Sequence, residues 1–183
     1  MNQLLDSKNI DGKLNVSKFP LNEKQTYSLN EENPWVKSIL IELNENAESK
    51  LPEEYLDNSF LKAELELVKK HNGTYGEYFL LNCSIDTEYF TQCVRTQHEM
   101  KDSLHFEFKA CIIDHAFEAG EELQDQIDIF MDNDVWELHF YDNRIAMIKE
   151  IVHEQIYLNI NQYPVSDYDA ELPWAKETSS TKQ

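Results

Sequence analysis

The residues of this 183-residue chain that are best suited to chemistry lie in the segment Cys93-Val94-Arg95-Thr96. A thiol two positions before an arginine, where a strand enters a turn, can have a lowered pKa, or the arginine can serve as a basic contact point for a partner. A small packed thiol beside a surface arginine explains the same pattern more simply. The sequence therefore indicates Cys93 and Arg95 as candidate binding residues rather than catalytic ones.

Patterns that are typical of catalysis are incomplete in this chain. It has only four glycines and contains neither a Gly-rich phosphate loop nor a Gly-x-Ser-x-Gly nucleophile elbow. His98-Glu99 and His153-Glu154 begin like a zinc-protease helix, but neither pair has the required histidine three residues further on. We therefore predict that the protein is not an enzyme and uses no cofactor and no metal ion.

Acidic residues crowd the segment 116–142. Its aspartates are spaced in a way that suggests a calcium loop, but the central glycine and the final glutamate of such a loop are missing. A metal-dependent nuclease that uses these carboxylates is the enzymatic alternative, and a solvated acidic loop is the simpler interpretation. The predicted acidic partner surface consists of Glu121, Glu122, Asp125, Asp128, Asp132 and Asp134.

The whole chain is strongly acidic. It has 16 basic and 35 acidic residues and a net charge of −19, of which −11 belongs to residues 116–183. Nucleic acids and anionic lipids are bound largely through cations, so this charge predicts no binding to DNA or to membranes and favours a basic protein as the partner. A role of the acidity in solubility alone is the other interpretation.

Two further features indicate the cellular compartment. No apolar run approaches the roughly 20 residues that a membrane helix needs, and the N-terminal residues lack the pattern of a secretory signal. The three cysteines are odd in number and widely spaced, which suits reduced thiols. We therefore expect a cytoplasmic protein.

A local cationic patch offers an alternative way to bind a partner. A few cations beside aromatic rings can bind single-stranded RNA even when the total charge is negative. Direct RNA binding of this kind would use Arg95, Lys69, Lys70, Lys101 and Lys109 together with Tyr78 and Phe90.

The elements that must position these residues predict an α+β fold. Apolar and polar residues alternate near 61–68, 79–93 and 104–112, with short turns between the runs, which predicts an antiparallel β meander. A short N-terminal helix is expected from about Pro34. An amphipathic C-terminal helix over about 143–159, capped by Asp142 or Asn143, is expected to pack on the sheet. Shorter strands are predicted at 127–131 and 135–140.

The predicted organisation is one domain with an extension at each end. Residues 1–32 are expected to form an extended or partly disordered arm with one short strand over Leu14–Phe19. Residues 33–165 are expected to form the α+β domain, with a linker at 45–54, and residues 166–183 a flexible polar tail.

At Cys93-Val94-Arg95 the sequence resembles the YceD family, the large ribosomal RNA subunit accumulation proteins of bacteria and plastids. The alternating run Leu61–Val68, the glycine-containing turn and the run Leu80–Asp86 precede this segment in the family's order, and Ile148–Asn159 is similar to the family's last helix. The resemblance covers about residues 33–165. The family signature is Cys-x-Arg-Cys, and this chain has Thr96 in place of the second cysteine, so too few cysteines remain for a Cys-based zinc site.

The resemblance implies a factor in biogenesis of the large ribosomal subunit that supports accumulation of 23S rRNA without catalysis. The implied partner is a basic ribosomal protein or the pre-50S particle, and direct contact with rRNA is the alternative. Only Cys93 and Arg95 carry over from the signature.

Overall fold

The structure is a computed structural model that describes residues 10–47, 49–73, 76–117 and 136–166. Its main feature is a curved five-stranded sheet in the order β2-β3-β4-β5-β6. The strands are β2 (Lys24–Leu29), β3 (Phe60–Asn72), β4 (Gly76–Gln92), β5 (Glu99–Asp114) and β6 (Glu137–Tyr141). The predicted α+β class and the antiparallel meander of β3, β4 and β5 are confirmed.

Strand β6 departs from the meander because it pairs parallel to β5, with Ala110 opposite Glu137. The long connection between β5 and β6 permits this arrangement, since parallel strands need a crossover of roughly a dozen residues or more. The strand expected at 135–140 is therefore present with a small shift. The strand expected at 127–131 lies outside the described residues.

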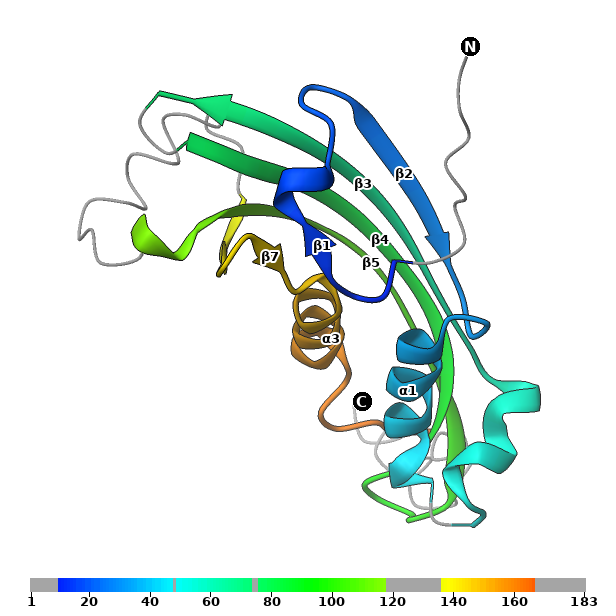
Figure 1. Cartoon of the computed structure of the whole chain (residues 1–183). Coiled ribbons are helices and arrows are strands. Elements are labelled where there is room, and N and C mark those ends of the chain that lie inside the picture. Colours follow the sequence, from blue (N-terminus) through cyan, green and yellow to red (C-terminus); the bar gives the residue numbers. More distant parts are fainter. Residues whose placement is uncertain (1–9, 48, 74–75, 118–135, 167–183) are drawn as a thin grey trace, which may run out of the picture.

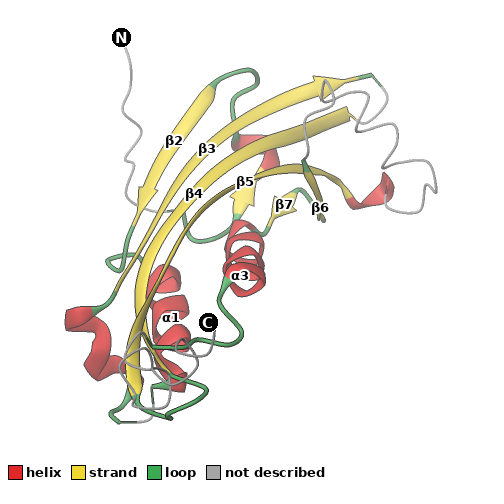
Figure 2. Cartoon of the chain, turned by 180° about the vertical axis from the view of Figure 1, so that it is seen from behind, coloured by secondary structure: helices red, strands yellow, loops and turns green. Residues whose placement is uncertain are grey.

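One face of the sheet holds the core. The register places Leu65 beside Cys83 and Cys83 beside Phe108, so odd-numbered residues of β3 and β4 share a face with even-numbered residues of β5. Most of these side chains are buried, and each large aliphatic one contributes roughly 1.5–3 kcal/mol relative to exposure. Figures 1 and 2 show that the sheet curves around this face and that the helices lie on its concave side.

Two α-helices are described, α1 (Pro34–Leu43) and α3 (Ile148–Asn159). Helix α1 begins with proline in its first turn, as predicted, and buries Trp35, Val36, Ile39, Leu40 and Leu43. The C-terminal helix is shorter than predicted. It starts later because Ile145–Ala146 form strand β7 instead of the first helical turn. The residue before the helix, Met147, makes no side-chain cap hydrogen bond.

The N-terminal residues 10–32 belong to the packed domain, which corrects the expectation of an extended arm. Strand β1 (Leu14–Asn15) pairs antiparallel with β7, a 3-10 turn follows at Val16–Lys18, and β2 forms one edge of the main sheet. The Phe19 ring packs edge-to-face on Phe79, with the ring centroids 5.3 Å apart. The expected linker also packs, since it contains the 3-10 helices Asn44–Asn46 and Pro52–Asn58 and the buried Tyr55.

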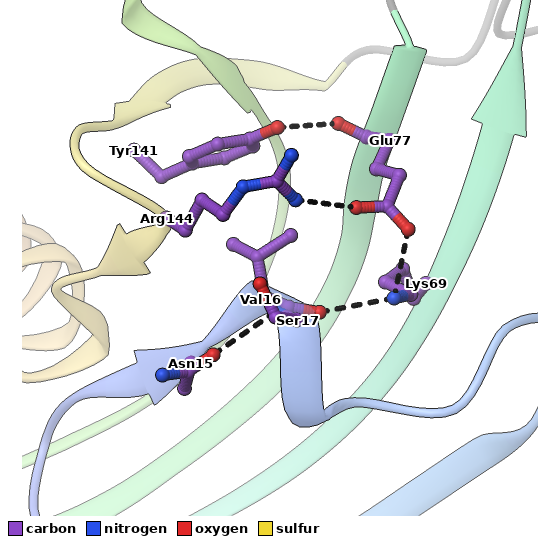
Figure 3. A network of polar contacts seen from close by, with 7 residues as sticks. All are labelled: Asn15, Val16, Ser17, Lys69, Glu77, Tyr141 and Arg144. Atoms are coloured by element: carbon purple, nitrogen blue, oxygen red, sulfur yellow. Dashed lines mark hydrogen bonds and ion pairs between the residues drawn. The ribbon is translucent and has the colours of Figure 1, made fainter.

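A buried lysine connects these segments. Lys69 continues the inward-facing series of β3, and only 5% of its surface is exposed. Its Nζ donates to the carbonyl oxygen of Val16 at 2.9 Å and contacts Glu77 Oε1 at 3.0 Å (Figure 3). Glu77 also contacts Arg144 at 3.3 Å, and its carbonyl oxygen accepts a bond from the Tyr141 hydroxyl at 2.9 Å. The network thus joins the N-terminal segment, two central strands and the turn after β6.

We predict that Lys69→Met destabilises the protein because it removes the cation from this network. Loss of one partner of a fully buried ion pair costs about 3–5 kcal/mol. Because the Glu77 side chain is 31% exposed and also contacts Arg144, we expect a loss of about 2 kcal/mol in the free energy of unfolding, measured by urea titration. Lys70→Met is the matched control, since Lys70 points to the opposite face, and equal losses in the two variants would contradict the prediction.

Candidate binding site at the β4–β5 hairpin

The hairpin that joins β4 to β5 is a closed loop over residues 93–98. The Cys93 N–H donates to the carbonyl oxygen of His98 at 2.9 Å, and the Gln97 N–H donates to the carbonyl oxygen of Cys93 at 2.8 Å. Gln97 has a positive φ of 58°, which lets the chain reverse within a few residues. The Arg95 side chain is exposed on this loop, whereas Cys93 is buried at its base.

The Cys93 thiol lies among hydrogen-bond donors. The Thr96 hydroxyl, followed by the backbone N–H groups of Ser166, Thr96 and Arg95, favours the thiolate more strongly than burial opposes it, and the pKa of Cys93 is lowered to about 6. Thr96 is therefore the main donor to the thiolate. By contrast, burial raises the pKa of Cys83, and it raises that of Cys111 to about 12.

The segment after α3 is attached to this hairpin. The Val94 N–H donates to the carbonyl oxygen of Pro164 at 2.9 Å, and the Ser166 N–H points to Cys93 Sγ at 3.5 Å. The two contacts hold residues 164–166 against the end of β4. Residues far apart in the sequence thereby become the walls of one cleft.

This cleft, of about 310 Å³, lies between the end of α1, the end of β4 and the segment after α3. It carries two carboxylates, Glu42 and Glu45, and two phenol rings, Tyr89 and Tyr157, and no lysine or arginine is among its described lining residues. The remaining lining residues are Leu43, Asn46, Thr91, Gln92, Val94, Ile160, Asn161, Gln162 and Pro164.

One of the two carboxylates, that of Glu42, is held in place by neighbouring side chains. Glu42 Oε2 is 2.8 Å from His153 Nε2, and the His153 ring packs against Tyr157 with the centroids 4.7 Å apart. Burial raises the pKa of Tyr157, and the neighbouring Glu42 and Glu45 raise it further, so this phenol remains protonated and can donate a hydrogen bond. A site with positioned carboxylates and aromatic faces suits a lysine or arginine side chain.

A larger depression of about 820 Å³ involves side chains of the opposite, solvated sheet face. Four glutamates, Glu64, Glu66, Glu107 and Glu137, and one lysine, Lys109, are among its lining residues, and part of this charge is already paired. Lys24 forms an ion pair with Glu66, and Lys109 Nζ lies 5.4 Å from the centroid of the Trp136 ring. The smaller cleft is the better candidate because its described lining contains no lysine or arginine and because it adjoins the predicted hairpin through Val94.

The predicted cationic patch is assembled only in part, since Lys101 and Phe90 are in contact and the other members lie apart. Lys101 pairs with Glu88 and lies over the Phe90 ring, which packs on Tyr55. Tyr78 is buried in a separate small cluster with Cys111 and Ile113. It precedes Phe90 on β4 by roughly 40 Å of strand.

Two further lysines of the predicted patch are also apart from the hairpin. Lys69 is buried on the concave side, and Lys109 lies beside Trp136. Of the six predicted binding residues Cys93, Arg95, Lys101, Lys109, Tyr78 and Phe90, only Cys93 and Arg95 are in the hairpin loop.

The predicted acidic partner surface falls outside the described residues, since Glu121, Glu122, Asp125, Asp128, Asp132 and Asp134 all belong to 118–135. Within the part of the chain that is described, no three or more His, Cys, Asp or Glu side chains are grouped closely enough to hold a metal ion. No helix in that part has the length and apolar composition to cross a bilayer.

The cleft residues Glu42, Glu45, Tyr89 and Tyr157 escaped prediction because they come from three separate segments and no local motif connects them. Comparisons with family models, with curated proteins and with solved structures find no match to this chain. The candidate site therefore rests on the geometry of the described residues and not on a relative.

We predict that Cys93 alone titrates as a thiol near pH 6 in the folded protein. The thiolate absorbance at 240 nm should rise around this pH, and the rise should be absent in Cys93→Ala. Thr96→Val should move the rise to higher pH, because it removes the strongest donor.

The lowered pKa of Cys93 makes the free energy of unfolding depend on pH. The folded pKa of about 6 is below the unfolded value of roughly 8.5, so the unfolded chain binds more protons between these values. The stabilisation by the thiolate is complete above roughly pH 8.5 and is lost as the pH falls through 6. The stability difference between the wild type and Cys93→Ala should follow this course, and parallel pH profiles would contradict the assignment.

Proposed function

We propose that this protein is a non-catalytic binding protein whose partner is basic, and that the cleft beside the β4–β5 hairpin accepts a lysine or arginine side chain of that partner. The observation that carries the proposal is the composition of the cleft. Two carboxylates and two tyrosine rings line it, its described lining contains no lysine or arginine, and Glu42 also contacts His153.

The charge of the whole chain supports the same conclusion. A net charge of −19 attracts a basic partner over distances of about a Debye length, which is about 8 Å at physiological ionic strength. Such attraction mainly raises the rate of encounter, whereas the fit of a side chain into the cleft sets specificity. Binding should therefore weaken as salt is added, without being abolished by loss of any single surface charge.

We further propose that the basic partner is a ribosomal protein, free or in the pre-50S particle, and that the protein supports 23S rRNA accumulation in the cytoplasm. This part rests on the resemblance to the YceD family at Cys93-Val94-Arg95, the segment that borders the cleft through Val94. The scattered positions of Lys101, Lys109, Tyr78 and Lys69 disfavour direct rRNA binding through the patch considered above.

The two parts can be tested separately. Tagged protein is recovered from cells of its own species at low salt, and the bound proteins and RNA are identified. Enrichment of a basic ribosomal protein, or of pre-50S particles, is expected. Recovery of a different basic protein would reject the ribosomal assignment alone, and recovery of no basic protein would reject the binding proposal as well.

Neutralising the cleft should weaken this interaction. The double variant Glu42→Gln/Glu45→Gln is expected to raise the Kd for the recovered basic partner by about tenfold or more, because a bound cation loses two carboxylates. Titration calorimetry measures the change. Glu53→Gln/Glu54→Gln is the matched control, since it alters net charge equally at exposed positions of the 3-10 helix Pro52–Asn58, outside the cleft. Equal weakening in both variants would show that only total charge matters.

A further inference from the structure

Among the described residues, the main sheet has an unpaired border along the first part of β5. Strand β6 pairs with β5 only from Ala110 to Asp114, and no described strand pairs with residues 99–109 on that side. Figure 2 shows β5 bordering the sheet over this stretch. The border is roughly 36 Å long, and its outward backbone N–H and C=O groups form a template for another strand.

The side chains of this border suit a covering strand. On the concave side, Met100, Leu104 and Phe106 remain partly exposed although Leu104 and Phe106 pack against the core. On the convex side the residues are polar and alternate in charge, with Glu99, Lys101, Glu107 and Lys109 among them. A strand that pairs here must therefore present apolar residues on one face and matching charges on the other.

We propose that a second copy of this chain supplies that strand, so that two β5 edges pair antiparallel about a two-fold axis at Leu104 and join two sheets into one. In this register Lys101 lies opposite the Glu107 of the other copy and Glu99 lies opposite its Lys109. Met100 faces Phe108 and the two Leu104 side chains face each other. The border is thus self-complementary in charge and in apolar contacts, as a two-fold interface requires.

Neighbouring registers are less favourable. A two-fold axis at Ser103 sets Glu99 against Glu107, and an axis at His105 sets Lys101 against Lys109, so each places like charges opposite one another. Asp102 is the one acidic residue on the concave side of the border and would face Phe106. Its Oδ2 accepts a hydrogen bond from the Tyr89 hydroxyl at 3.4 Å, which turns the carboxylate toward its own chain.

This pairing is independent of the proposed function, because the border and the acidic cleft share no residue. A dimer of this kind would carry two copies of the cleft. It also removes an exposed strand edge, which otherwise favours uncontrolled association.

The experiment is sedimentation equilibrium of the full chain at low micromolar to about 100 micromolar concentration. The wild type is expected to have the mass of two chains. In a dimer of E107K, Lys101 of each copy would face a lysine of the other copy, and in a dimer of K101E, Glu107 of each copy would face a glutamate. Because like charges repel, each variant alone is expected to sediment as one chain. E64K is the matched control for E107K, because it changes the net charge by the same amount at an exposed residue of β3, two strands away from the border strand.

Mixing E107K with K101E provides the decisive measurement. In a mixed pair both cross-strand contacts again join opposite charges, so a dimer that contains one copy of each variant should form. Circular dichroism verifies that both variants are folded. A monomeric wild type, a dimer that survives in E107K, or folded variants that do not pair when mixed would each overturn the proposal.

Discussion

The alternation of strand β4 is the constraint on which the rest of the structure depends. From Phe79 to Cys93 every second side chain faces the concave side, and nearly all of these residues are buried. A strand of this length whose side chains are buried on one face must pair with another strand on each side. Other elements must also pack on that face. Strands β3 and β5 supply the neighbours, while α1, α3 and the N-terminal segment supply the cover (Figure 1).

The same alternation accounts for two of the side chains with polar partners in the interior. Lys69 and Cys93 both fall at inward-facing positions, Lys69 near one end of the sheet and Cys93 near the other. Each end provides partners for its polar group, because an unpaired buried polar atom is costly. Lys69 is paired with Glu77 and the Val16 carbonyl, and the Cys93 sulfur receives the donors of the hairpin and of Ser166. In both cases these contacts attach a terminal segment of the described chain to the sheet.

The candidate site follows from the second of these attachments. Once residues 164–166 are bound to the hairpin, the end of α1 and the end of β4 face them across a small cleft. Glu42 of α1 and Glu45 of the following 3-10 helix then form part of its wall. The two carboxylates and two phenols of the cleft form a surface that suits recognition of a cation.

The sequence by itself determined the α+β class, the three long strands and the approximate helices, because periods of 2 and of 3.6 residues follow directly from which side chains avoid water. It also indicated the hairpin at Cys93. Only the tertiary structure decided that residues 10–32 pack in the core, that β6 runs parallel to β5 and that Lys69 is buried, since these depend on contacts between distant segments. The same holds for the cleft, because Glu42, Tyr89 and Tyr157 become neighbours only when the chain is folded.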